Sequence, residues 1–410
     1  MGPAFDAQPS RGGETPGQEL GQESGQAAAK ACAISRAGIP DASGALKVSD
    51  ASDVSDAVDA SEASNASEAP DASNASNTSD VLVLENLGVH FTDDDGLPLP
   101  AVQNVSFALK RGSVTCLVGE SGCGKSLTAR ACLGLVPRGG ALSGRALYGG
   151  RDLLALSEKE WQGLRGSEIA MIFQEPMTAL NPVLKVGMQA AEPLRCHRGL
   201  GRREARERVI ELFEEVGIPS AADRFDLYPH ELSGGMRQRV MIAMSLSCEP
   251  AVLFADEPTT ALDATIQGQI LAILDEERKR RGMSVLLITH DLGVVAQVAD
   301  TVGVMYAGHL VEWGSVEDVL RSPAHPYTRG LMACDPASAP RELDRLNTIP
   351  GSVPTPGFMP KGCPFHPRCR EANDFCRKAM PREREQNGHR VLCWQAYAPE
   401  TTRWTRRGQQ

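Results

Sequence analysis

Hydrophobic residues in the central part of the chain fall into short continuous runs, each of which ends at polar residues or glycine. Four of these runs predict strands that are buried on both faces, as in a parallel sheet. They lie over residues 113–118, 168–173, 251–255 and 284–289. In residues 203–216 the apolar positions instead recur at helical spacing, and Gly217 and Pro219 end that pattern. Strands that alternate with helices predict an α/β fold.

Residues 1–80 have a different composition, dominated first by Gly, Gln and Glu and then by Asp-Ala-Ser and Asn-Ala-Ser repeats. Few aromatic or large aliphatic residues are available for burial there, so the segment cannot offset the entropy lost on folding. We expect a disordered acidic tail, with a docking or localisation role as the alternative. Residues 401–410 are expected to form a second, flexible tail.

The composition of the 410-residue chain, 41% hydrophobic and 23% charged, is that of a soluble globular protein. No stretch reaches the roughly 18 continuous apolar residues that a membrane span requires, and the first residues lack the pattern of a secretory signal. The net charge of −10 argues against a surface that binds nucleic acid throughout. The eleven cysteines favour free thiols or metal ligands over structural disulfides.

Gly119-Glu-Ser-Gly-Cys-Gly-Lys-Ser126 matches the pattern of a phosphate-binding loop. It stands between an apolar run and a helix-like run from Leu127 to Leu135, as the pattern requires. Glycines let the backbone amides turn toward a polyphosphate, and the start of the helix adds the positive end of its dipole. Lys125 would contact the β- and γ-phosphates, and the Ser126 hydroxyl would bind Mg²⁺.

Polar residues follow three of the predicted strands directly: Gln174, the pair Asp256 and Glu257, and His290. Open α/β sheets bind ligands at the carboxyl ends of their strands. One carboxylate there can hold Mg²⁺, the next can deprotonate an attacking water, and the histidine can contact a γ-phosphate. Taken singly, each residue is also typical of a solvated strand end.

Phe91 lies roughly thirty residues before the phosphate-binding loop. An aromatic side chain at that place can stack on an adenine ring, and a strand phenylalanine can equally belong to the core. Spacing alone does not separate the two interpretations.

Four cysteines, Cys363, Cys369, Cys376 and Cys393, fall within about thirty residues near the end of the chain. Their spacing is not the paired short loop of structural zinc sites, although His366 could take part in a zinc version. Four thiolates can also bind an iron–sulfur cluster. Free thiols or redox pairing are the alternatives to a metal.

These elements together resemble the ATPase subunit of an ATP-binding cassette (ABC) transporter, from about residue 81 to residue 394. The resemblance rests on Gly119–Ser126, Gln174, Leu232-Ser-Gly-Gly-Met236, Asp256-Glu257, Thr260-Ala-Leu-Asp263 and His290, in that order. Three further runs resemble the oligopeptide/dipeptide importer branch. They are Phe173–Pro182, Ser233–Ala243 and His325–Arg329. Within that branch, Ala170–Phe173 and Val240–Ala243 are more similar to the D-type subunit.

The resemblance implies a P-loop NTPase fold of the ABC type, with a helical signature subdomain and a small Cys-rich C-terminal extension. The ATPase domain would cover residues 81–324, its helical subdomain about 175–245, and the extension 325–400. Matching segments of the family are associated with a [4Fe–4S] cluster, which implies that the four cysteines bind one. Cys123 replaces a common serine, and we expect it to make the site sensitive to thiol reagents.

Residue roles also follow from the resemblance. Glu257 would be the general base of ATP hydrolysis, assisted by Gln174 and by His290, which steadies the γ-phosphate. Magnesium would be held by Ser126, Gln174 and Asp256. The nucleotide contacts would be Phe91, Gly119, Glu120, Ser121, Gly122, Cys123, Gly124, Lys125, Ser126, Leu127, Ser233, Gly234, Gly235 and Asp263.

Partners are implied as well. Two such ATPase domains face head to tail, so a second copy or a paralogue is expected, together with two membrane-spanning permease subunits and an extracytoplasmic solute-binding protein. The chain would lie on the cytoplasmic face of the cell membrane and bind no nucleic acid.

Three alternatives remain open. The same transporter role could serve nickel or another small solute, which an ATPase sequence does not distinguish. A soluble ABC ATPase acting on nucleic acid or ribosomes usually has two cassettes or a long coiled-coil insertion, and this chain has neither. A nucleotide-binding regulator without turnover is disfavoured by Glu257 and His290.

Overall fold

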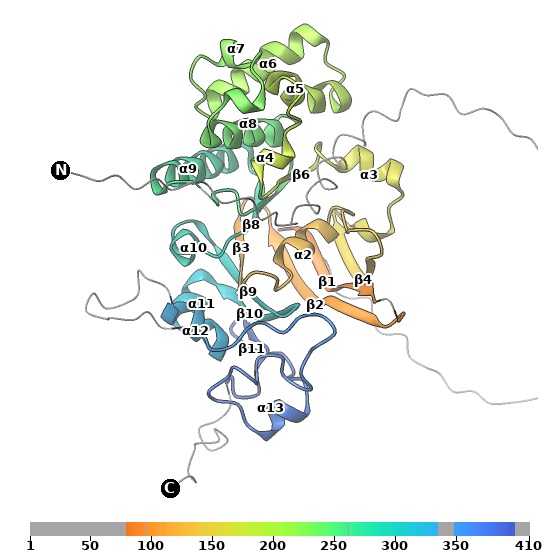
Figure 1. Ribbon diagram of the computed structural model, residues 1–410, viewed down its shortest axis with the longest axis vertical. Helices are drawn as coiled ribbons and strands as arrows, with labels where there is room; N and C mark the ends of the chain where they lie inside the picture. Colours follow the sequence, from red (N-terminus) through yellow and green to blue (C-terminus); the bar gives the residue numbers. More distant parts are fainter. Residues whose placement is uncertain (1–78, 94, 261, 335–347, 398–410) are drawn as a thin grey trace, which may run out of the picture.

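The computed structural model describes residues 79–93, 95–260, 262–334 and 348–397. Two sheets and a set of helices make up these residues, so the predicted α/β fold is confirmed (Figure 1). Nearly all of the tail predicted over residues 1–80, and all of the tail predicted over 401–410, lie outside the described residues. Within the described ranges, no helix has the length and hydrophobicity needed to span a membrane.

The larger sheet has eight strands. In spatial order they are β11 (Arg384–Gln386), β12 (His389–Val391), β10 (His309–Ser315), β9 (Thr301–Tyr306), β3 (Val114–Val118), β8 (Ser284–Ile288), β7 (Val252–Asp256) and β6 (Ile169–Ile172). The strands from β9 to β6 are parallel, and β10, β12 and β11 extend the sheet antiparallel. Every residue of β3, β6, β7 and β8 is buried, which confirms the four strands predicted to be buried on both faces.

The smaller sheet is antiparallel. Its spatial order is β2 (Pro98–Lys110), β1 (Asp80–Thr92), β4 (Ala141–Tyr148) and β5 (Arg151–Asp152). Helix α2 (Lys125–Ala131) contacts β1 of this sheet as well as β7 and β8 of the larger one. Leu84 and Phe107 of the smaller sheet share one core with Phe254 and Leu286 of the larger sheet. The helix that follows the phosphate-binding loop is therefore held between the two sheets.

A group of helices separates β6 from β7 in the chain and lies at the top of Figure 1, away from the smaller sheet. It consists of α4 (Pro176–Ala179), α5 (Val186–His197), α6 (Arg202–Glu215), α7 (Ala221–Arg224), the 3-10 helix η3 (Pro229–Glu231) and α8 (Gly234–Leu246). Helices α5, α6 and α8 contact one another. Val209, Leu212 and Phe213 are buried on α6, so the helix predicted over residues 203–216 is confirmed.

The remaining helices connect and cover the strands. They are η2 (Leu153–Ala155), α3 (Glu158–Leu164), α9 (Ala264–Arg281), α10 (Leu292–Val298), α11 (Val316–Arg321), α12 (Pro326–Cys334) and α13 (Asp374–Lys378). Helix α9 begins at Asp263, whose carboxylate accepts from the backbone N–H groups of Thr265 and Ile266. It ends at Gly282, which has a left-handed backbone with φ of 65°.

Residues 348–397 add to the larger sheet at its antiparallel end. Strand β12 pairs with β10, and the backbone N–H of Leu392 donates to the carbonyl of Val311. Phe365, 4% exposed, belongs to the same core as the parallel strands. The C-terminal segment is therefore bonded to the larger sheet through backbone pairing and core packing.

Candidate functional site

The phosphate-binding loop turns sharply between β3 and α2, and two of its glycines are required by the backbone. Gly119 has a φ of 151°, and a Cβ atom there would lie 2.2 Å from the carbonyl oxygen of Met305. Gly124 has a φ of 104°, and a Cβ atom there would lie 3.2 Å from the carbonyl oxygen of Ala101. A side chain at either position would strain the loop, because L-residues rarely adopt these angles.

Lys125 and Ser126 begin α2 and both take part in hydrogen bonds of the loop. The Lys125 ammonium, on a residue only 5% exposed, donates to the carbonyl oxygens of Gly119 at 2.8 Å and Glu120 at 3.1 Å. The Ser126 hydroxyl donates to Asp256 at 2.7 Å. The Lys125 ammonium is thus held beside the loop, where it could donate hydrogen bonds to the oxygens of a bound phosphate.

Asp256 ends β7 and is completely buried. Its Oδ2 atom has no hydrogen-bond partner among the described residues. Burial raises the pKa of this carboxyl, while the hydrogen bond from Ser126 opposes that effect. A buried carboxylate oxygen without a partner, beside a serine hydroxyl, fits the oxygen ligands that Mg²⁺ prefers.

Side chains from three other places in the chain contact the Glu257 carboxylate. Its Oε2 atom accepts from Thr260 at 2.8 Å and from Gln174 at 3.1 Å, and His290 Nδ1 lies 3.4 Å away. The residue has a left-handed backbone with φ of 46°, which costs energy for a side chain other than glycine. Gln174, Glu257 and His290, predicted separately from three strand ends, therefore come together around one carboxylate.

The signature residues and Asp263 lie at the starts of two helices, α8 and α9. The Ser233 hydroxyl accepts from the backbone N–H of Met236 and so caps α8 in the upper helical group of Figure 1. A Cβ atom on Gly235 would lie 3.1 Å from the side chain of Ile266, so the start of α8 lies beside the start of α9. Ser233 and Gly234 are exposed.

Phe91 lies near the end of β1 and is half-buried. It packs against the core formed between the two sheets, and a Cβ atom on Gly140 would lie 3.0 Å from its ring. Part of the ring remains accessible, so stacking on adenine stays a prediction.

The phosphate-loop cysteine does not lie in the exposed environment that we expected for a reactive thiol. Cys123 is completely buried, and burial raises the pKa of its thiol, although nearby Lys125 opposes the effect. Thiol reagents act on exposed thiolates. The expectation that Cys123 makes the site sensitive to such reagents is therefore not supported by its position.

The four C-terminal cysteines are free thiols. The backbone N–H of Cys363 donates to the carbonyl of Cys376 at 2.8 Å. Burial raises the pKa of Cys363 to about 11 and that of Cys369 to about 12, and the thiol of Cys393 adds to both shifts. Among the described residues, no three histidine, cysteine, aspartate or glutamate side chains form a group that could hold a metal ion. The structure therefore places the thiols near one another without forming a metal site.

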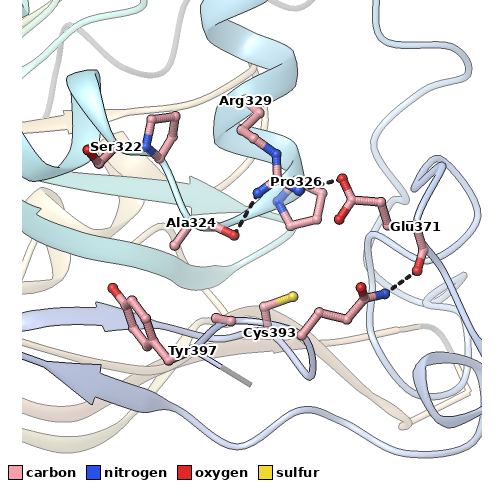
Figure 2. Close-up of a pocket in the computed structure, with 10 residues that line it drawn as sticks. Ser322, Ala324, Pro326, Arg329, Glu371, Cys393 and Tyr397 are labelled. Carbon is pink, nitrogen blue, oxygen red and sulfur yellow. Dashed lines mark hydrogen bonds and ion pairs between the residues drawn. The ribbon is translucent and has the colours of Figure 1, made fainter. Parts of the chain in front are cut away.

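Cys393 also lines a pocket of about 470 Å³ between α12 and the C-terminal segment (Figure 2). An ion pair between Arg329 and Glu371 stands at one side of it, and Gln395 donates to the carbonyl of Glu371. Arg329 also donates to the carbonyl oxygen of Ala324 at 3.0 Å. The polar groups of the wall are thus largely bonded to one another.

Sequence reasoning missed two residues that contact the phosphate-binding loop from the C-terminal region. The Arg368 guanidinium donates to both carboxylate oxygens of Glu120, at 2.6 and 2.9 Å. The backbone N–H of Glu120 donates to the Tyr327 hydroxyl at 2.9 Å. Both residues stand in runs that the sequence analysis singled out, but no local pattern links them to a loop some 200 residues earlier.

Comparison with known proteins decides the family. Residues 102–260 match a model described as ABC transporter, and residues 311–376 match one described as oligopeptide/dipeptide transporter, C-terminal region. The chain is 49% identical over 321 residues to the dipeptide transport ATP-binding protein DppD of Bacillus subtilis, covering 77% of this chain and 94% of the relative. It belongs to the ABC transporter ATPases. The predicted family and its ATPase activity are therefore confirmed.

Other ABC transporter proteins support the same assignment. The oligopeptide transport ATP-binding protein OppD of Salmonella typhimurium is 46% identical over 314 residues, covering 77% of this chain and 93% of that protein. The dimeric structure of the bacterial ABC transporter cassette MJ0796 superposes with a TM-score of 0.52 at 26% identity, over 57% of this chain and 98% of that one. The P-loop NTPase fold of the ABC type is confirmed.

Proposed function

We propose that this chain is the ATP-hydrolysing subunit of an importer for dipeptides or oligopeptides. The observation that carries the proposal is the similarity to DppD, which covers 94% of that dipeptide transport protein. Residues 311–376 also match the C-terminal region of oligopeptide/dipeptide transporters, so the similarity includes more than the part common to ABC transporters. No observation in the site favours nickel or nucleic acid over peptide.

For the nucleotide, we propose that Lys125 and the loop from Gly119 to Leu127 hold the phosphates of ATP, with Phe91 beside the adenine. Ser126 and Asp256 would hold Mg²⁺ directly or through water, together with Gln174. The ion, when bound, supplies positive charge against the charge that develops on the phosphates. The uncompensated Oδ2 atom of buried Asp256 supports this assignment.

For hydrolysis, we propose that Glu257 takes the proton of the attacking water. Hydrogen bonds from Thr260 and Gln174 hold its carboxylate at the edge of the parallel strands. His290, 64% exposed at its side chain, is free to turn toward a γ-phosphate. Positioning of this kind is the main contribution that a protein makes to phosphoryl transfer.

A second ATPase would complete the site. The signature residues Ser233, Gly234 and Gly235, together with Asp263, would contact the nucleotide and loop of that partner. The neighbour MJ0796 has been solved as a dimer, and one of its structures is a post-hydrolysis state bound to ADP and phosphate. We propose the same head-to-tail arrangement, with a copy of this chain or a paralogue.

Permease subunits would dock on the helical group. Val183, Leu184 and Met188 are 75, 39 and 55% exposed and follow Gln174 closely in the chain. Exposed apolar residues that cluster in this way mark interaction surfaces. We propose that they bind two membrane-spanning subunits, which place the chain on the cytoplasmic face of the membrane and connect it to a solute-binding protein outside.

The domain limits are proposed as predicted: an ATPase domain over residues 81–324, a helical subdomain over about 175–245, and a C-terminal extension over 325–400. Within the extension we propose a [4Fe–4S] cluster at Cys363, Cys369, Cys376 and Cys393. The proposal rests on the four thiols within residues 363–393 and on the backbone hydrogen bond of 2.8 Å from Cys363 to Cys376, which joins two of their segments. Iron and sulfide analysis of the anaerobically purified chain tests it, and equal iron in the wild type and in a Cys363→Ser, Cys369→Ser variant would refute it.

The test of the function as a whole is to purify the chain from its own membranes in mild detergent. Two multi-span proteins, a second ATPase and an ATPase rate that rises with a peptide-loaded binding protein would support the proposal. Stimulation by nickel rather than by peptides would indicate that the metal is the transported solute. Recovery only with ribosomes or nucleic acid would overturn the importer assignment.

A further inference from the structure

The C-terminal region contacts the phosphate-binding loop at Glu120. The Arg368 guanidinium makes a two-pronged ion pair with the Glu120 carboxylate, at 2.6 and 2.9 Å. Tyr327 on α12 accepts a hydrogen bond from the backbone N–H of the same residue at 2.9 Å. Side chain and backbone of Glu120 are therefore both held by groups that follow the ATPase domain in the chain.

Arg368 is fixed on every side. It is 8% exposed, its Nε donates to the carbonyl of Pro350 at 2.8 Å, and its Nη2 donates to that of Ile349 at 3.3 Å. The guanidinium also lies over the ring of Tyr306, 5.7 Å from its centroid. Planar two-pronged pairs of this kind fix geometry as well as charge. An isolated surface ion pair has neither the burial nor the additional partners.

An aromatic cluster supports the same contact. Phe365, three residues before Arg368, packs edge-on against Tyr306 and Tyr327, with ring centroids 5.1 and 5.4 Å away. Tyr306 and Tyr327 are completely buried. The loop between Cys363 and Cys369 is thereby packed against β9 and α12. This packing holds Arg368 next to the phosphate-binding loop.

Glu120 matters for the nucleotide because of where its charge lies. It is the second residue of the loop, and its carbonyl oxygen accepts from the Lys125 ammonium at 3.1 Å. An unpaired carboxylate there would repel the anionic triphosphate, since like charges at short range disfavour each other. Arg368 offsets that charge and holds the carboxylate in one place.

We propose that Arg368 and Tyr327 are positioning residues for ATP, so that the C-terminal region completes the phosphate-binding loop. The proposal rests on the proposed nucleotide site at Lys125. Loss of the arginine leaves an uncompensated negative charge beside the triphosphate, and the affinity for ATP falls. Removal of that charge by Glu120→Gln restores the affinity, which a purely structural role of Arg368 does not predict.

The experiment measures ATP affinity on the full chain and KM and kcat for ATP in the assembled transporter. Arg368→Met should weaken binding about ten-fold, at the lower part of the range found for coupled sites, and raise KM with little change in kcat. Glu120→Gln combined with Arg368→Met should return both values close to wild type. Arg329→Met removes another ion pair of the same region, to Glu371, and should change neither value.

Three results would overturn the proposal: wild-type affinity in Arg368→Met, no recovery in the double variant, or an equal loss in Arg329→Met. Arg368→Lys keeps the positive charge, so this variant replaces Arg368→Met in the test if the methionine variant does not fold. It should raise KM by a smaller factor, and a wild-type KM would also overturn the proposal. Absence of ATP binding in the wild type, with no difference from Lys125→Ala, would refute the nucleotide site itself.

Discussion

Replacement of Glu257 by glutamine isolates the proposed general base, because it removes one charge and keeps the size of the side chain. The Glu257 side chain is 15% exposed, and its Oε2 atom accepts from Thr260 at 2.8 Å and from Gln174 at 3.1 Å. The amide oxygen of glutamine can accept the same two hydrogen bonds. The side chain should therefore keep its place while it loses the ability to take a proton from water.

The expected loss of activity is much larger than the expected loss of stability. A positioned general base contributes about 10²–10⁴-fold to a rate, which corresponds to about 2.7–5.5 kcal/mol in the activation free energy. The charge on Glu257 also attracts His290 at 3.4 Å, but that histidine is 64% exposed. Exposed pairs contribute about 0–1 kcal/mol to the free energy of unfolding. ATP binding and folding should thus survive the substitution.

The assay is phosphate release by the assembled transporter at saturating ATP, with ATP binding and the unfolding midpoint measured on the same preparation. Glu317→Gln is the matched control, since it removes the same charge from an exposed ion pair with Arg321 at 3.0 Å. The control should hydrolyse ATP like the wild type. Turnover by Glu257→Gln within about three-fold of the wild type would refute a contribution of the size expected for a general base.

Three further predictions concern other parts of the chain. Met188→Asp should abolish co-purification with the permeases and leave ATP binding unchanged, whereas Leu97→Asp, at a side chain 61% exposed between β1 and β2, should change neither. Burial lowers the pKa of His325 to about 4 from an ordinary value of 6.5. Stability from this group is therefore complete above pH 6.5 and is lost as the pH falls through 4, by about 3 kcal/mol. A His325→Gln variant should lose less over that interval in unfolding experiments, and parallel curves would contradict the assignment. Thiol reagents should modify exposed Cys196 in the native chain and leave buried Cys123 untouched, as located by mass spectrometry. Faster modification of Cys123 would show that the loop opens.

The elements that hold the nucleotide could be predicted from the sequence because their signals are local. A continuous apolar run predicts a strand buried on both faces, and β3, β7 and β8 are buried throughout. The loop glycines follow from backbone sterics, as the φ of 151° at Gly119 shows. Parallel strands place their carboxyl ends at one edge, which brings Asp256 and Glu257 next to the other strand ends.

Contacts between distant segments could not be predicted, because no periodicity or spacing encodes them. Arg368 and Glu120 are 248 residues apart, and the tertiary packing of Phe365 on β9 and α12 helps to bring the arginine to the loop. The burial of Cys123 depends equally on the surrounding core. The sequence by itself determined the loop geometry and the strand-end residues from which a nucleotide site is proposed, since local backbone preferences and residue chemistry decide those. The tertiary structure alone decided that the C-terminal region supports the phosphate-binding loop, because long-range packing sets which side chains meet.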